Sequence, residues 1–133
     1  MYSTNYVKAT NIADAASRLK AADDGKLLAG GMTLLPTLKQ RLANPDCLVD
    51  LAGCELAGIS DDGDSIRIGA MTRHVDVASS PLVQKTIPAV AHLAGHIGDR
   101  QVRNRGTIGG SVANNDPSAC YPSAVLALGG TVH

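Results

Sequence analysis

The sequence predicts an α/β (α+β) fold with two lobes, a small βαβ lobe and a mixed, partly antiparallel one. Two short apolar runs, 26–29 and 47–51, enclose a helical pattern, which is typical of a βαβ unit with a right-handed crossover. Two alternating segments on either side of an acidic turn then indicate a hairpin. Because the sequence pattern changes after Gly53, we place the lobes at 1–53 and 54–133.

The first lobe opens with an amphipathic helix. Asn11 is a suitable N-cap, and the helix is expected to run to about Asp24. Its predicted apolar face consists of Ile12, Ala15, Ala16 and Leu19. The apolar run 26–29 is too short for a helix, so we predict a strand there.

A second helix of the first lobe follows the pair Gly30-Gly31. Its apolar pattern consists of Leu34, Leu35, Leu38 and Leu42. Pro36 is compatible with it, because the N–H groups of a first helical turn have no intrahelical partners. The run 47–51 is the second predicted strand.

The second lobe is predicted to begin with a hairpin of residues 57–60 and 65–70. Thr72 is expected to cap a helix over 73–79, and a longer helical pattern over 82–98 is broken near Pro88. Residues 99–115 look irregular. Asp116 and Pro117 are expected to start a last helix that reaches Leu128, because aspartate is a good N-cap and proline suits the first helical position.

Thr131, Val132 and His133 resemble the first residues of another strand, so the second lobe is expected to be incomplete.

Composition excludes several classes of protein. The 12 Lys and Arg residues balance 12 Asp and Glu residues, and there is no Phe or Trp, so general nucleic-acid binding is not expected. The three cysteines form no CxxC pair, which argues against a disulfide framework or a structural zinc site and favours a cytoplasmic location. No segment is apolar for the roughly 18 to 20 residues of a membrane span, and the N-terminus lacks the apolar core of a signal peptide.

Two glycine-rich segments carry the chemistry. The first glycine segment is LAGGMTLLP (28–36), and the second is RGTIGGSVAN (105–114). Glycine lets a backbone approach a ligand closely, and the neighbouring hydroxyl residues can donate hydrogen bonds, so both segments suit phosphate oxygens. The alternative is that both are structural turns. Neither segment is a Walker A motif or a GxGxxG motif, which excludes simple ATPase and Rossmann interpretations.

Three runs in order resemble one family: AGGMTLLPTLKQRLANPDCLVDL, IRIGAMTRHVDVASSPLV and VRNRGTIGGSVANNDPSACYPSAVLALGGTV. They are similar to the FAD-binding subunit of molybdenum hydroxylases, which is the medium subunit of the aerobic carbon monoxide dehydrogenase family and the equivalent of the flavin domain of xanthine dehydrogenase. The resemblance covers almost the whole chain. It implies a two-lobed FAD-binding domain of the PCMH type, with 1–53 as the first FAD-binding lobe and 54–133 as the second.

The resemblance also implies which residues bind FAD. In the first glycine segment and its flanks they are Leu27, Leu28, Ala29, Gly30, Gly31, Met32, Thr33 and Leu34. In the second they are Thr107, Ile108, Gly109, Gly110 and Ser111, followed by Asn114, Asp116 and Cys120. The family commonly has an aspartate at position 120, where it holds a ribose hydroxyl. A thiol is a poor acceptor for that hydrogen bond.

The function implied by the resemblance is electron transfer. Substrate is oxidised at a molybdenum cofactor on a large subunit, electrons pass through 2Fe-2S clusters on a small subunit to FAD, and oxygen, a quinone or NAD accepts them. No catalytic side chain is expected, because the reactivity belongs to the cofactor. The alternative is a truncated, flavin-free structural or interaction module, which Cys120 and the abrupt end at His133 favour.

The remaining polar clusters have simpler interpretations. His92 and His96 have a spacing that can bind metal, but no further ligand completes a site. The acidic residues of 61–64 fit a hairpin turn rather than a calcium loop. Arg100, Arg103 and Arg105 form a basic patch that we expect to face solvent or another subunit.

Overall fold

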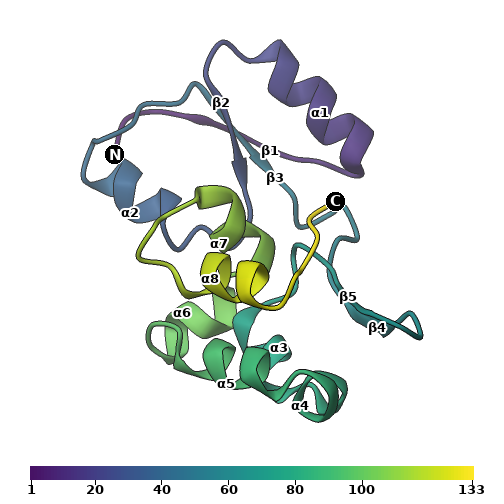
Figure 1. Ribbon diagram of the computed structural model, residues 1–133. Helices are drawn as coiled ribbons and strands as arrows, with labels where there is room; N and C mark the ends of the chain where they lie inside the picture. Colours follow the sequence, from purple (N-terminus) through teal and green to yellow (C-terminus); the bar gives the residue numbers. More distant parts are fainter. The chain divides into compact units, whose positions relative to one another are not determined.

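The computed structural model describes residues 1–133 and divides them into two compact units, Met1–Leu56 and Ala57–His133 (Figure 1). The first unit contains a parallel sheet with two helices, and the second contains a hairpin with six helices. The predicted α/β fold class is confirmed.

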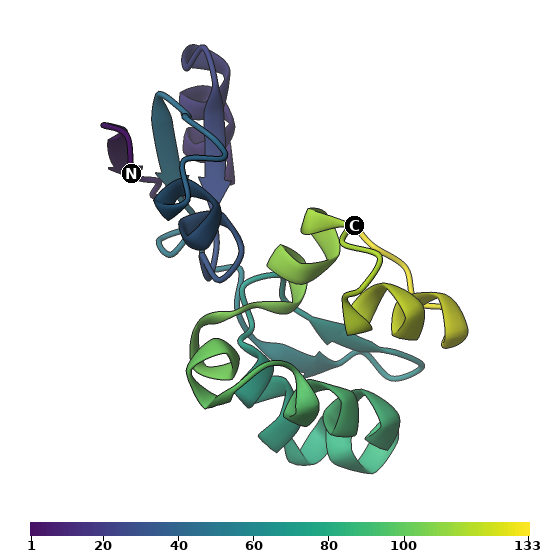
Figure 2. The same cartoon turned by 90° about the vertical axis from the view of Figure 1, so that its left-hand side faces the viewer.

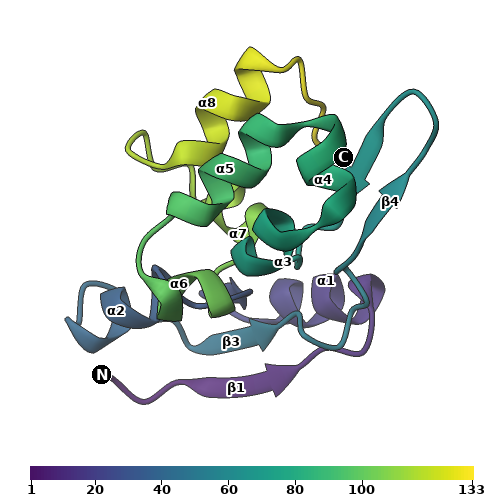
Figure 3. The same ribbon diagram turned by 90° about the horizontal axis from the view of Figure 1, so that it is seen from below.

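The sheet of the first unit has three strands, β1 (Asn5–Lys8), β2 (Gly25–Leu28) and β3 (Cys47–Asp50). Their order is β1-β3-β2, and β3 pairs in parallel with both neighbours. Figure 3 shows β1 and β3 lying along one another. The predicted βαβ unit is therefore confirmed for β2 and β3, whereas β1 was not predicted. Its four residues are mostly polar and exposed, with Val7 alone half-buried.

The first helix, α1 (Ile12–Ala21), begins as predicted, because the Asn11 side chain accepts a hydrogen bond of 2.8 Å from the Asp14 N–H. It ends at Ala21 rather than near Asp24. The Asp46 carboxylate holds the turn that follows by accepting hydrogen bonds from the Asp23 and Asp24 N–H groups. The predicted apolar face is partly wrong, because Ala15 is buried but Ile12 is 61% exposed.

The second helix, α2 (Leu34–Lys39), tolerates Pro36 in its first turn as predicted. It ends before Leu42, which is 73% exposed, so the inclusion of Leu42 in the apolar pattern is wrong. The reason is Arg41, whose left-handed backbone (φ 59°) stops the helix. The core of this unit joins strand and helix residues: Ala9, Ala15, Val49 and Cys54 are buried, with Val7, Cys47, Leu51 and Leu56 packed against them.

The second unit begins with the antiparallel hairpin of β4 (Ile59–Asp61) and β5 (Ile66–Ile68), which confirms the prediction. The Asp61 carboxylate accepts a hydrogen bond from the Gly63 N–H in the turn. Three helices follow, α3 (His74–Ser79), α4 (Pro81–Thr86) and α5 (Pro88–His96). Figure 2 shows them gathered on one side of the hairpin. The break between α4 and α5 lies at Pro88, as predicted.

Residues 99–115 are not irregular, contrary to the prediction. They form α6 (Arg100–Arg105) and α7 (Ile108–Asn114). Each helix has a side-chain cap that was not predicted: Asp99 accepts from the Val102 N–H, and Thr107 accepts from the Gly110 N–H.

Two further capping predictions are wrong. Thr72 does not cap α3, because its buried hydroxyl exchanges hydrogen bonds of 3.0 Å with the backbone of Gly58. Asp116 accepts from the Ser118 N–H in a turn, and α8 (Cys120–Ala127) begins only afterwards. Residues 131–133 form no strand.

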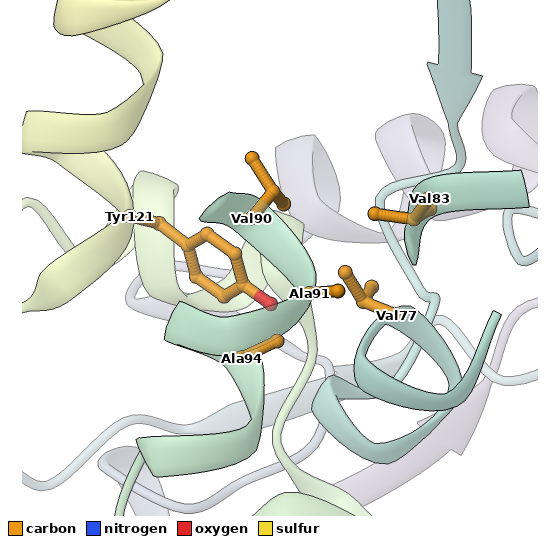
Figure 4. Packing of buried hydrophobic residues seen from close by; sticks show 6 residues of the cluster. All are labelled: Val77, Val83, Val90, Ala91, Ala94 and Tyr121. Atoms are coloured by element: carbon orange, nitrogen blue, oxygen red, sulfur yellow. The ribbon is translucent and has the colours of Figure 1, made fainter. Parts of the chain in front are cut away.

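The core of the second unit lies among α3, α4, α5 and α8 (Figure 4). Its buried members are Val77, Val83, Val90, Ala91, Ala94 and Tyr121. Figure 4 shows the ring of Tyr121 reaching from α8 toward Ala91 and Ala94 of α5. Tyr121 is thus the one large aromatic side chain of this core. None of the helices combines the length and the apolar character that crossing a membrane requires.

Candidate functional site

The first glycine segment connects β2 to α2. Its glycines are buried, and Gly31 has a positive φ of 75° that favours glycine. Within Met1–Leu56, the backbone N–H groups of Gly30, Gly31, Met32 and Thr33 donate no hydrogen bond, and the Thr33 hydroxyl makes none. The Gly31 carbonyl accepts from the Leu35 N–H and starts the helix. Four successive N–H groups of this turn are therefore without a partner, and successive N–H groups of a turn can bind an anion.

Gly31 is also required for packing inside its own unit. A Cβ at this position would lie 2.9 Å from Cδ1 of Leu35 and 3.2 Å from Cδ1 of Leu28. These two leucines come from α2 and β2, so they form an apolar floor under the loop. The segment is therefore both a structural turn and a row of free donors. The other predicted residues of this region, Leu27, Ala29 and Leu34, flank the turn along the same stretch of chain.

The second glycine segment has a different geometry, because it forms the start of α7. The Ile108 N–H donates to the Thr72 carbonyl at 3.0 Å, and the Gly109 N–H donates to the Ala70 carbonyl at 2.8 Å. Gly110 donates to the Thr107 hydroxyl, and Ser111 to the Thr107 carbonyl. The first N–H groups of this helix are therefore already satisfied, unlike those of the first segment.

The glycine at position 109 is explained by close packing. A Cβ there would lie 2.5 Å from Cβ and 2.7 Å from the carbonyl oxygen of Ala70. Among the backbone N–H groups and hydroxyls of residues 106–111, two make no hydrogen bond inside Ala57–His133, the Thr107 N–H and the hydroxyl of Ser111. The glycine N–H groups of this segment, by contrast, all donate inside the protein.

The three remaining predicted residues, Asn114, Asp116 and Cys120, are all exposed. Asn114 is the last residue of α7, and Asp116 holds the turn that follows. Cys120 is the first residue of α8, and its thiol makes no hydrogen bond. Of these side chains, Asp116 already has a partner within the protein.

One buried polar pair, His74 and Tyr121, was not predicted from the sequence. His74 is only 4% exposed, its ring centroid lies 5.4 Å from that of Tyr121, and neither His74 Nδ1 nor the Tyr121 hydroxyl has a hydrogen-bond partner. Burial lowers the pKa of His74 and raises that of Tyr121, so both are neutral near pH 7. The signal in the sequence was a lone histidine inside the apolar pattern of 73–79.

The other polar clusters serve the local fold. The Arg103 guanidinium donates to the Ile97 and Gly98 carbonyls, at 3.2 and 3.0 Å, and so satisfies the end of α5. Arg100 and Arg105 are exposed. The rings of His92 and His96 lie 4.2 Å apart, and His96 Nδ1 contacts the His92 carbonyl oxygen. No group of three or more His, Cys, Asp or Glu residues is arranged to hold a metal ion.

Removing the Tyr121 hydroxyl is expected to stabilise the protein. In Tyr121→Phe, the unpartnered buried oxygen disappears while the ring stays, so the free energy of unfolding should rise by about 1 kcal/mol. Urea unfolding of the two proteins measures the change. Tyr6→Phe is the matched control, because the Tyr6 hydroxyl does donate to the Asp50 carboxylate and its removal should cause a small loss. A loss of stability in Tyr121→Phe would show that the hydroxyl has a partner.

Comparison with known proteins gives a consistent result. A family model described as the FAD binding domain in molybdopterin dehydrogenase matches residues 2–133. The nicotine 6-hydroxylase medium subunit of Paenarthrobacter nicotinovorans is 40% identical over 128 residues, which cover 96% of this chain and 45% of that protein. The carbon monoxide dehydrogenase medium chain of Hydrogenophaga pseudoflava is 48% identical over 106 residues, covering 79% of this chain and 37% of that protein.

Solved structures agree with these sequence matches. A carbon monoxide dehydrogenase from Hydrogenophaga pseudoflava has a TM-score of 0.92 at 43% identity, covering 95% of this chain and 45% of that one. Quinoline 2-oxidoreductase from Pseudomonas putida 86 has a TM-score of 0.87 at 36% identity, covering 91% of this chain and 43% of that one. The chain thus spans a little under half the length of the relatives it matches.

Proposed function

The chain belongs to the family of FAD-binding domains in molybdopterin dehydrogenases, and from this premise we propose that it holds the FAD through which a molybdenum hydroxylase passes electrons to an external acceptor. FAD is the cofactor, because the family model that the chain matches describes an FAD-binding domain. The observation that supports the proposal most is the row of free N–H groups from Gly30 to Thr33, at a turn shaped by the positive φ of Gly31.

The proposed contacts differ between the two glycine segments. In the first, the N–H groups of residues 30–33 and the Thr33 hydroxyl would donate to phosphate oxygens of FAD. In the second, the Thr107 N–H and the Ser111 hydroxyl are the donors, and Gly109 keeps α7 against the backbone of Ala70. FAD supplies the redox chemistry when bound, whereas the side chains of this chain bind and orient it.

The partners follow from the family and are proposals. We place a large subunit with the molybdenum cofactor and a small subunit with 2Fe-2S clusters upstream of FAD, and oxygen, a quinone or NAD downstream. Two relatives are named as medium subunits or chains of enzymes with different substrates, nicotine and carbon monoxide. The substrate is therefore not a property of this chain. The three cysteines are free thiols, which supports a cytoplasmic location.

A flavin titration tests the proposal. The purified chain is mixed with FAD, filtered to remove free cofactor, and examined by visible absorption. Retained oxidised flavin with a defined stoichiometry is the expected result. Riboflavin, which lacks the phosphates that the glycine segments are proposed to hold, is the matched control and should be lost. A chain that retains neither compound would contradict the proposal and favour the flavin-free module.

Replacing Cys120 by aspartate is expected to tighten FAD binding. Cys120 is exposed and its thiol makes no hydrogen bond, so a carboxylate can be accommodated there. It would offer a charge-assisted hydrogen bond to a ribose hydroxyl, and 1.4 kcal/mol of such an interaction corresponds to about a tenfold lower Kd. The first turn of α8 also favours a negative charge, and the Asp116 carboxylate is already hydrogen-bonded to the Ser118 N–H.

The measurement for Cys120→Asp is a flavin fluorescence titration at fixed salt concentration. Cys120→Ser is the control, because it offers a neutral hydroxyl of similar size and should change the Kd less. Equal or weaker binding by the aspartate variant would show that residue 120 does not face the ribose.

A further inference from the structure

The backbone around His74 is joined to the start of the second glycine segment. The His74 N–H donates to the Gly106 carbonyl at 3.0 Å, and the Ile108 N–H donates to the Thr72 carbonyl at 3.0 Å. Between these two hydrogen bonds, Arg73 and Thr107 form an isolated antiparallel bridge. Whatever fixes His74 therefore fixes the backbone at Thr107 as well.

The imidazole of His74 lies directly against Gly106. A Cβ at residue 106 would lie 2.6 Å from Nε2 and 2.8 Å from Cδ2 of His74, and 3.0 Å from the Val102 carbonyl oxygen. Gly106 has φ −62° and ψ 144°, a conformation that any residue adopts. Backbone conformation thus does not require glycine at this position. The close approach of the His74 ring and of Val102 does.

The imidazole also faces the start of α8. The ring of Tyr121 lies 5.4 Å away, centroid to centroid, at an interplanar angle of 39°. His74 therefore lies between Gly106 and Tyr121. Gly106 directly precedes Thr107, and Tyr121 directly follows Cys120. Thr107 and Cys120 are both among the residues of the second unit that are proposed to bind FAD.

No charged group holds the imidazole in place. On α3, the Arg73 guanidinium pairs with the Asp76 carboxylate at 2.8 Å. On α6, Arg103 donates to carbonyls of residues 97 and 98, and Arg105 is exposed. On α8, the Tyr121 ring is the facing group, and its hydroxyl is unpartnered. The ring of His74 is therefore held by packing, with Nδ1 also lacking a partner.

We infer that His74 is a positioning residue for FAD: its buried ring, wedged between Gly106 and Tyr121, sets where the Thr107 backbone and Cys120 stand. This inference rests on the proposed function, because it concerns the affinity for the cofactor. It assigns a role to a side chain that does not itself reach the ligand. It also explains why residue 106 has no side chain.

A pair of amides provides the first arm of the test. The glutamine side chain can place its amide near the position of Nε2 and keep the contact with Gly106, whereas the shorter asparagine cannot. In FAD titrations of the chain, His74→Gln should bind within about threefold of the wild type, and His74→Asn at least about tenfold more weakly. Urea unfolding establishes that both variants are folded. Equal affinities of the two amide variants would overturn the inference.

A double-mutant cycle provides the second arm. Gly106→Ala should weaken FAD binding about tenfold or more, because the new Cβ meets Nε2 of His74. Combined with His74→Ala, which removes the ring, the same change should weaken binding much less. Independent effects of the two substitutions would contradict the inference.

The two proposals fail in different ways. A wild-type chain that binds no FAD contradicts the proposed function. A wild-type chain that binds FAD, with affinities that are independent of the residue at position 74, contradicts the positioning role alone. Should the alanine variants prove unfolded, the Gln and Asn pair decides, since both preserve a polar side chain of the same chemistry.

Discussion

Gly31→Val is expected to abolish FAD binding while most of the helix content remains. Residue 31 has φ 75°, a conformation in which a side chain costs about 1 to 2 kcal/mol, and a β-branched side chain is the least suited to it. The added Cβ would also lie 2.9 Å from Leu35. The turn must change its conformation to relieve both, and the free N–H groups of residues 30–33 would be displaced. A loss of affinity of at least about a hundredfold is expected.

Flavin fluorescence titration measures this effect, and circular dichroism monitors the helix content. Gly63→Val is the matched control. Gly63 has a similar φ of 85°, but it lies in the turn of the β4–β5 hairpin with no atom within 4 Å of its ideal Cβ. It should lower the stability through the same conformational cost and leave FAD binding intact. Unchanged flavin binding in Gly31→Val would remove the first glycine segment from the site.

Strands and helices were predicted best from the sequence where the spacing of apolar residues and the turn-forming residues at the ends indicated the same element. The strands β2 and β3 and the hairpin are short apolar or alternating runs bounded by glycine or acidic residues, and all are present. Strand β1 was missed because it has a single half-buried apolar residue, Val7, and is held by backbone pairing with β3. Such pairing depends on a partner more than 40 residues away, which no local pattern reveals.

The candidate site shows a different limit. The two glycine segments look alike in sequence, yet one leaves its N–H groups free and the other satisfies them with the carbonyls of Ala70 and Thr72. The difference arises from a tertiary contact. The contact between His74 and Gly106 could likewise not be predicted from the sequence, because it joins residues 32 positions apart.

Gly109→Ala is expected to destabilise the second unit and to weaken FAD binding, although alanine normally stabilises a helix by about 1 kcal/mol relative to glycine. The new Cβ would lie 2.5 Å from Cβ, 2.7 Å from the carbonyl oxygen and 2.8 Å from Cα of Ala70. Most of these atoms are backbone, so they cannot turn aside as a flexible side chain can. Overpacking of this kind costs about 1 to 3 kcal/mol, which outweighs the helical gain.

The consequence for FAD follows from the hydrogen bond that the clash disrupts. If α7 moves away from Ala70, the 2.8 Å bond from the Gly109 N–H is lost, and the Thr107 and Ser111 donors are displaced with the helix. Urea unfolding and FAD titration should therefore both report a loss. Gly95→Ala in α5 is the control, because the nearest atom to its Cβ, that of Ala78, is 3.9 Å away, and stability should be equal or higher. An increase in stability for Gly109→Ala equal to that of Gly95→Ala would show that α7 and Ala70 are not in close contact, and that the glycine at 109 is kept for another reason.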